Sequence, residues 1–266
     1  FVFDASTPTD TAQVCFNKDD GTPYKAWNNI AFRADRVSGG QTNSLLPAEA
    51  PKVSIREICG LIGDYAWFDT DGNGQQDDGE KAAPGVVFQL VDSSGAVVTD
   101  ATGAPIQATT NTDGYYAFDV PIGDWKVQVA SIPAGYVLTK ANAEGVDDAV
   151  DSDVTALNTP TAAVTIDKDN LQNTTLDAGL IPVVSVGDFV WVDANNNGVQ
   201  ADGDASGLNG VTLTLTGPDG SPVKDVFGND VGPVVTADKA GKPGYYEFPN
   251  LPVLAAGQSY TVTVTP

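Results

Sequence analysis

The sequence predicts an all-β protein made of tandem antiparallel β-sandwiches with no substantial helix. Three observations support this fold class. Stretches of about five to seven residues rich in Val, Thr, Tyr and Phe are separated by clusters of Gly, Pro, Asn and Asp. No segment shows helical periodicity. One unit occurs twice, and its complete copy has about seven strand-like stretches, the number typical of a β-sandwich.

The repeat is clearest in its opening strand and in an aromatic strand further along. Gly63–Asp69 reads GDYAWFD and returns as Gly187–Asp193, which reads GDFVWVD. An Asp, Asn and Gly-rich loop follows each copy, and a Val- and Leu-containing strand comes next. The aromatic strand is YYAF at Tyr115–Phe118 and YYEF at Tyr245–Phe248. These matches predict two copies of one domain.

The two copies end differently, and this sets the predicted domain boundaries. After its last shared strand at 125–129, the first copy continues into two more strand-like stretches. The second copy stops soon after the equivalent strand at 260–264. We therefore predict a small β module, or the remainder of an upstream domain, at 1–60. A complete repeat at 61–182 and a C-terminally incomplete repeat at 183–266 follow.

The charge of the chain is strongly acidic and unevenly distributed. The 266 residues contain 35 acidic and 13 basic side chains, a net charge of −22, which argues against nucleic acid and anionic membranes as partners. Residues 61–180 hold 19 acidic and 4 basic side chains, a net charge of −15. Such clustering favours a cation site. There is no apolar run of 18 residues, so we expect no membrane span in this chain.

Catalysis is not expected. Histidine is absent, which excludes Ser-His and Cys-His catalytic arrangements and His-based metal sites. The acidic residues cluster at metal-ligand spacing within loops, which does not suggest a glycosidase pair. We predict that the protein is not an enzyme.

The two cysteines, Cys15 and Cys59, favour a disulfide and an extracellular location. The alternative is a pair of buried free thiols in a cytosolic protein. The chain starts at Phe1 instead of methionine, so we expect a processed product or a fragment.

The loop at 69–80 reads DTDGNGQQDDGE and matches the calcium pattern D-x-[DN]-x-[DN]-G-x5-E at every specified position. Calcium takes six to eight oxygen ligands, which a tightly curled acidic loop can supply. The predicted ligands are Asp69, Asp71, Asn73, the Gln75 carbonyl, Asp77 and Glu80. The alternative is an Asx-rich turn with solvated carboxylates, but five acidic residues in twelve would then repel one another.

The equivalent loop at 193–204 reads DANNNGVQADGD and keeps positions 1, 3, 5 and 6 of the pattern. Position 9 is Ala201, and position 12 is an aspartate, one methylene shorter than glutamate. The predicted ligands are Asp193, Asn195, Asn197, the Val199 carbonyl, Asp202 and Asp204. Fewer charges predict a weaker calcium site, and an ordinary turn remains the alternative.

A third acidic cluster at 147–153 reads DDAVDSD. Alternation along an extended chain places Asp151 and Asp153 on the same side. We predict that they join Asp147 or Asp177 around another calcium ion beside the first loop. The alternative is a solvated run of charges.

Together, the opening GDYAWFD strand, the loop that follows it, the TDGYYAF segment at 112–118 and the DSD at 151–153 resemble the SdrD B-like repeats. These are the calcium-binding B domains of serine-aspartate-repeat surface adhesins, related to the Cna_B repeats of collagen adhesin. The resemblance covers 61–180 well and 185–266 in part. It implies a transthyretin-like or immunoglobulin-like β-sandwich whose calcium ions rigidify a surface stalk. It also places Asp69, Asp71, Asn73, Gln75 and Glu80 in the metal loop.

The expected function is a non-enzymatic, calcium-stabilised structural or adhesive segment of a bacterial cell-surface protein, secreted or anchored to the cell wall. It would act as a rigid stalk or spacer. Its partners would be neighbouring domains or subunits of the same surface protein, and any host or matrix ligand is unnamed by the sequence. One alternative is a fibre or pilus subunit assembled by donor-strand exchange, with Phe1–Phe3 as the donor strand. Another is a ligand-binding adhesin module that uses residues 1–60.

Overall fold

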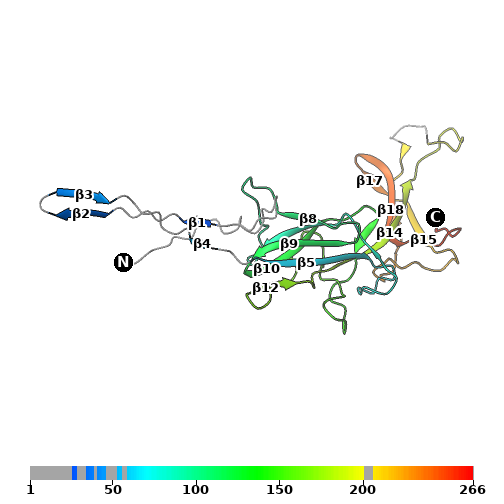
Figure 1. Ribbon diagram of the computed structural model, residues 1–266. Coiled ribbons are helices and arrows are strands. Elements are labelled where there is room, and N and C mark those ends of the chain that lie inside the picture. The colour runs from blue at the N-terminus through cyan, green and yellow to red at the C-terminus, as the bar shows by residue number, and fades with distance from the viewer. Residues whose placement is uncertain are drawn as a thin grey trace.

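The computed structural model describes residues 59–200 and 206–265, together with the backbone of four short strands nearer the N-terminus. Those strands are β1 (Ala26–Asn28), β2 (Ala34–Ser38), β3 (Gln41–Leu45) and β4 (Val53–Ile55). β1 pairs with β4 and β2 pairs with β3, both antiparallel (Figure 1). Cys59 begins the next strand, whereas Cys15 lies outside the described residues, so the disulfide remains a prediction.

The first repeat consists of two β-sheets that enclose one core (Figure 1). The first sheet has the strand order β12-β10-β7-β8 and is entirely antiparallel. Its strands are β7 (Val87–Asp92), β8 (Gln107–Thr109), β10 (Gly123–Ser131) and β12 (Val164–Ile166).

The second sheet is organised around the long strand β5 (Cys59–Phe68). β5 pairs antiparallel with β6 (Lys81–Ala82) and β9 (Tyr115–Pro121). It pairs parallel with β13 (Gln172–Asn173) and with the start of β14 (Ala178–Phe189), which also pairs with β11 (Tyr136–Leu138). The all-β prediction is confirmed, and these two parallel pairs are an addition to it. They arise because the chain crosses to the first sheet as β12 before it returns beside β5.

Alternating residues of these strands face inward, as the period of a β-strand requires. The burial pattern of β9 is strictly alternating, with Tyr116, Phe118 and Val120 buried between more exposed neighbours. The Phe88 and Tyr116 rings stack with centroids 3.6 Å apart. Phe88 and Ile62 are among the largest fully buried side chains of this core, and Trp67 is also fully buried. Tyr116 and Phe118 of the recurring aromatic strand are therefore core residues, whereas Tyr115 is 54% exposed.

The second repeat begins within β14, which passes without interruption from one repeat into the next (Figure 1). From Val183 onward β14 pairs antiparallel with β18 (Lys242–Pro252), which pairs in turn with β17 (Ala237–Lys239). The opposite sheet has the order β16-β15-β19. Its strands are β15 (Thr212–Thr216), β16 (Val234–Val235) and β19 (Thr261–Thr265). A smaller core contains Leu213, Leu215, Val223, Phe248 and Leu251.

The strand pairings show the same internal repeat that the sequence predicts. β5 and β9 of the first repeat correspond to β14 and β18 of the second, and β7 and β10 correspond to β15 and β19. The described residues form no α-helix, and hence none that is long and apolar enough to cross a membrane.

Candidate metal sites

The loop at 69–80 curls around the carboxylate of Asp69, which directly follows β5 and is fully buried. One Asp69 oxygen accepts a hydrogen bond from the Gly72 amide at 2.7 Å. The other accepts from the Gly74 amide at 2.8 Å and from the Thr139 hydroxyl at 2.5 Å. Asp69 therefore fixes the loop backbone and orients the carboxylate at its centre.

The predicted ligand positions of this loop come together in space. Asp69, Asp71 and Glu80 each place a carboxylate oxygen within 4.8 Å of the other two. The Asn73 amide donates to Asp71 at 3.1 Å and to Asp77 at 2.6 Å. The Gln75 backbone amide donates to the Asn73 side-chain oxygen at 2.6 Å, and its side chain donates to Asp77 at 3.2 Å. Oxygen donors at this spacing suit a calcium ion.

Gly74 is required by the local backbone. Its φ of +80° lies in the left-handed region, and a Cβ there would be 2.7 Å from the Lys140 carbonyl oxygen. A side chain would collide with backbone and also strain the turn. The sixth position of the loop pattern therefore has a steric reason in this fold.

The first loop is attached to the third acidic segment predicted from the sequence. The Gln76 amide donates to the Val150 carbonyl at 2.8 Å, and the Ser152 amide donates to the Gly74 carbonyl at 3.1 Å. Gln75 and Asp151 form an isolated antiparallel bridge. The two acidic clusters consequently lie side by side.

Within this segment Asp148, Asp151 and Asp153 each place a carboxylate oxygen within 4.8 Å of the others. Sequence reasoning named Asp151 and Asp153 but missed Asp148, choosing its neighbour Asp147. The Asp147 carboxylate accepts from the Ala149 amide at 3.2 Å. Because both aspartates lie in a turn, strand alternation could not distinguish them.

Asp151 and Asp177 each have a buried carboxylate oxygen without a hydrogen-bond partner in the structure. Asp151 is 4% exposed and Asp177 is 1% exposed. The other Asp177 oxygen accepts from the Tyr65 amide at 2.8 Å. Burying a polar atom without a partner costs free energy, so two such oxygens near one another are unusual.

Burial also shifts the acidity of this region. It raises the pKa of Asp177 to about 9, and the nearby carboxylates of Asp64, Asp153 and Asp151 add to the shift. Burial raises the pKa of Asp153 to about 7, although the Asp177 amide donates to it at 2.7 Å. The aspartates are therefore destabilised as anions unless a cation compensates them.

The loop of the second repeat begins with a similar set of hydrogen bonds, but it is more exposed to solvent. Asp193 accepts from the Asn197 amide at 3.1 Å and from the Gly198 amide at 2.7 Å. Asn195 also accepts from the Asn197 amide, and the Asn197 side chain accepts from the Val199 amide at 2.7 Å. Asp202 and Asp204, the predicted closing ligands of this loop, lie outside the described residues.

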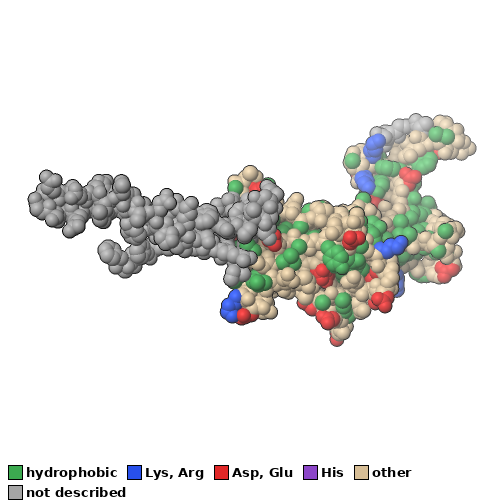
Figure 2. All heavy atoms as spheres, viewed as in Figure 1, with side chains coloured by type: hydrophobic (Ala, Val, Ile, Leu, Met, Phe, Trp, Pro, Cys, Tyr) green, Lys and Arg blue, Asp and Glu red, His purple; other side chains and the backbone are tan. Residues whose placement is uncertain are grey.

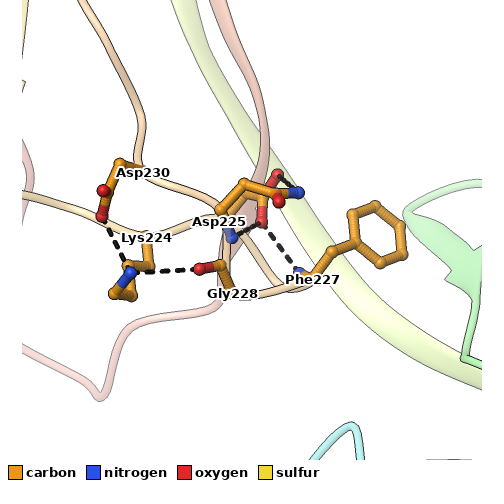
Figure 3. A network of polar contacts seen from close by, with 6 residues as sticks. Lys224, Asp225, Phe227, Gly228 and Asp230 are labelled. Atoms are coloured by element: carbon orange, nitrogen blue, oxygen red, sulfur yellow. Dashed lines mark hydrogen bonds and ion pairs between the residues drawn. The ribbon is translucent and has the colours of Figure 1, made fainter.

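The first loop also lies against the second repeat. A Cβ added to Gly72 would lie 3.4 Å from Ile181 Cδ1 and 3.7 Å from the Val226 carbonyl oxygen. Val226 belongs to a tight turn in which Lys224 contacts Asp230 at 2.8 Å and the Gly228 carbonyl at 3.1 Å (Figure 3). Asp225 accepts from the Phe227 amide at 3.0 Å in the same turn (Figure 3). The first metal loop and this turn of the second repeat are therefore close neighbours.

Acidic side chains gather along one edge of the first repeat, at the bottom of the view in Figure 2. Tandem β-sandwich repeats with converging carboxylates at one end of a sheet define the chain as a repeat protein with candidate cation sites. The SdrD B-like domain model matches residues 60–180 and 184–266. The chain belongs to the SdrD B-like domain family.

Related proteins include the serine-aspartate repeat-containing protein C of several Staphylococcus aureus strains. The chain is 34% identical to that of strain MW2 and 38% identical to that of strain N315, over 249 residues in each case. The alignments cover 92% of this chain but only 22% of each relative. The chain thus spans about a fifth of the length of these relatives.

Solved structures with a similar fold are more distant. The major pilin subunit of Bacillus cereus is 16% identical, with a TM-score of 0.35 over 63% of this chain and 40% of the pilin. The minor pilin GBS52 of Streptococcus agalactiae is 18% identical, with a TM-score of 0.31 over 56% of this chain and 58% of the pilin. At these scores the pilins carry no weight for function.

Proposed function

We propose that the chain is a calcium-stabilised, non-enzymatic spacer within a bacterial surface protein. The observation that carries this proposal is the pair of buried, unpartnered oxygens on Asp151 and Asp177, beside a loop whose carboxylates converge. Bound calcium would supply the positive charge that these oxygens lack.

The first ion would be held by Asp69, Asp71, Asn73, the Gln75 carbonyl, Asp77 and Glu80. The second would be held by Asp148, Asp151 and Asp153, with Asp177, directly before β14, supporting it. The loop at 193–204 would form a weaker third site, because it has fewer carboxylates and is more exposed.

The spacer role follows from how the repeats are joined. They share β14, and Gly72 of the first metal loop lies near Val226 of the second repeat, so that a Cβ added there would be 3.7 Å from the Val226 carbonyl oxygen. Ordering that loop would therefore restrict motion between the repeats as well as stabilise the first one. Membership of the SdrD B-like family supports a place at the cell surface, next to other domains of the same protein.

Calorimetric titration of chelator-stripped protein with calcium tests this proposal. We expect at least two ions per chain, one fewer in Glu80→Gln and one fewer in Asp151→Asn. Small-angle scattering should show a longer, narrower distribution of particle dimensions with calcium than with chelator. Calcium binding without any change in scattering would refute the spacer role, and no heat of binding would refute the metal sites.

A fibre subunit is a second candidate, supported by one open strand edge. Within the described residues β19 pairs only with β15, whereas its counterpart β10 pairs with both β7 and β12. A strand from another copy could complete this edge. The suggested donor, Phe1–Phe3, lies outside the described residues. Filaments in electron micrographs would support this candidate, and a monomer at all concentrations would exclude it.

A further inference from the structure

We propose that Asn197, in the loop of the second repeat, is a site of spontaneous deamidation, in which its side-chain amide becomes a carboxylate. Glycine after asparagine favours this reaction, because a residue without a Cβ lets the backbone approach the asparagine side chain. The sequence holds three such pairs, at Asn73-Gly74, Asn197-Gly198 and Asn209-Gly210. Their surroundings differ, and the structure singles out the second pair.

The reaction needs only the chain and water. The backbone nitrogen of Gly198 attacks Cγ of Asn197 and forms a new N–C bond. The Cγ–Nδ2 bond then breaks, and ammonia leaves with the proton of the glycine amide. Water opens the resulting cyclic imide and leaves a carboxylate, as aspartate or as isoaspartate. The first step requires the asparagine side chain to turn and the glycine amide to leave its hydrogen-bond partner, so that the reacting atoms meet.

The pair at Asn73 is held against this step. The Asn73 side-chain amide donates to Asp71 at 3.1 Å and to Asp77 at 2.6 Å. Gly74 is buried, and its amide donates at 2.8 Å to the carboxylate of Asp69, which is fully buried. Attack at Asn73 would have to break all of these hydrogen bonds inside a packed loop.

The pair at Asn209 is exposed, but both polar atoms of its side chain are held. The Asn209 amide donates to Asp238 at 2.6 Å, and the side-chain oxygen accepts from the Gly244 amide at 2.6 Å. Both partners belong to the β17–β18 hairpin. The Gly210 amide donates to the Thr236 carbonyl at 3.0 Å. Turning the Asn209 side chain would therefore detach it from this hairpin.

The pair at Asn197 has fewer restraints. Asn197 and Gly198 are both exposed. The Asn197 side-chain oxygen accepts from the Val199 amide at 2.7 Å, whereas no described residue accepts a hydrogen bond from its side-chain nitrogen. The Gly198 amide donates at 2.7 Å to Asp193 in the same exposed loop. Local opening of this loop frees both reacting groups without moving a strand or a core residue.

Deamidation would add a negative charge at the fifth position of the loop at 193–204. The calcium pattern accepts aspartate or asparagine at this position. A further charged ligand should tighten the weakest of the proposed calcium sites, because calcium affinity depends on the number of charged ligands. This consequence rests on the proposed calcium function, whereas the reaction itself does not.

Peptide mapping by mass spectrometry tests the proposal on the full chain during incubation in mildly alkaline chelator buffer. We expect deamidation at Asn197 to be about tenfold or more faster than at Asn73 and Asn209. In urea, the three rates should become similar, because unfolding removes the hydrogen bonds that separate them. Gly198→Ala should remove most of the reaction at Asn197. The matched control Gly210→Ala, also at a positive φ with open space around the added atom, should leave that reaction unchanged.

Two results would overturn the proposal. Equal rates at the three pairs in the folded chain would show that the Asn-Gly sequence alone decides the reaction. A slower rate at Asn197 than at Asn209 would show that the hydrogen bond to Asp193 protects the loop.

Calorimetric titration of Asn197→Asp tests the consequence for calcium. We expect its weakest calcium site to bind about threefold or more tightly than that of the unmodified chain. Unchanged affinity would overturn the link between deamidation and calcium. Failure of the chain to bind calcium at all would refute the proposed function, but it would leave the rates at the three pairs as they are, so the two failures are distinguishable.

Discussion

The two repeats place the same Asp-Asn-Gly loop in different surroundings. In the first repeat, Asp69 is fully buried and its loop is bonded to residues 150–152. In the second, Asp193 and Asn197 keep equivalent hydrogen bonds, but the loop is exposed. The difference shows that the loop motif alone sets the backbone shape, whereas the acidic segment at 147–177 turns that shape into a buried, charge-rich centre.

We expect the largest difference in unfolding free energy between replacing Asp69, the first aspartate of the buried loop, and replacing Asp193, its counterpart in the exposed loop. Asp69→Ala removes the acceptor for three hydrogen bonds and a predicted metal ligand, so we expect a loss of about 3 kcal/mol or more in unfolding free energy with calcium present. Asp193→Ala in the exposed loop should cost about 1 kcal/mol. Urea unfolding followed by Trp fluorescence measures both losses in unfolding free energy. Equal losses would show that the two loops do not differ in their contribution to stability.

A matched pair of glycines sharpens the same contrast. Gly74→Ala introduces a Cβ 2.7 Å from backbone at a φ of +80°, and we expect a cost of about 2–3 kcal/mol. Gly198 has a φ of +72° but nothing within 4 Å of the added atom. Gly198→Ala should therefore cost only about 1 kcal/mol. Unfolding free energies that do not differ would show that the first loop can move away from Lys140.

In the metal-free protein, the pH dependence of stability should also arise mainly from the first repeat. In the folded protein the pKa of Asp177 is about 9 and that of Asp153 is about 7, whereas the ordinary pKa of an aspartate is 3.8. The unfolded chain thus binds fewer protons in this window, and stability in chelator should fall as pH rises from about 4 to 9.

Calcium should abolish or reverse this fall, because the ion favours the deprotonated carboxylates. Urea midpoints at several pH values, with and without calcium, measure it. Asp177→Asn is the control that should flatten the curve in chelator. A midpoint that rises with pH in chelator would contradict the assigned burial.

The smallest expected effect lies in the turn that meets the first loop. The Lys224–Asp230 pair is solvent-exposed, and such pairs contribute little to stability. Lys224→Ala should change unfolding free energy by less than about 1 kcal/mol. A larger loss, seen only with calcium, would mean that the loaded loop depends on this turn.

Much of the fold could be predicted from sequence because strand alternation and the repeat are local signals. Val127 and Val129 have the period-two spacing of a buried face, and both are fully buried. The parallel pairing of β14 with β5 could not be predicted, because it depends on how the chain crosses between sheets after β12.

The candidate site was predictable in part for the same reason. The loop pattern identifies Asp69, Asp71 and Glu80 by spacing, and these three converge. Asp148 could not be told from Asp147, because a turn has no fixed period.

Thermal unfolding in millimolar calcium against excess chelator tests the central claim most directly. We predict a rise of about 10 °C or more in the midpoint with calcium, confined to the transition of the first repeat, and loss of most of that rise in Glu80→Ala. The same midpoint in calcium and chelator would show that the acidic loops are solvated turns, and the calcium-stabilised spacer would be excluded.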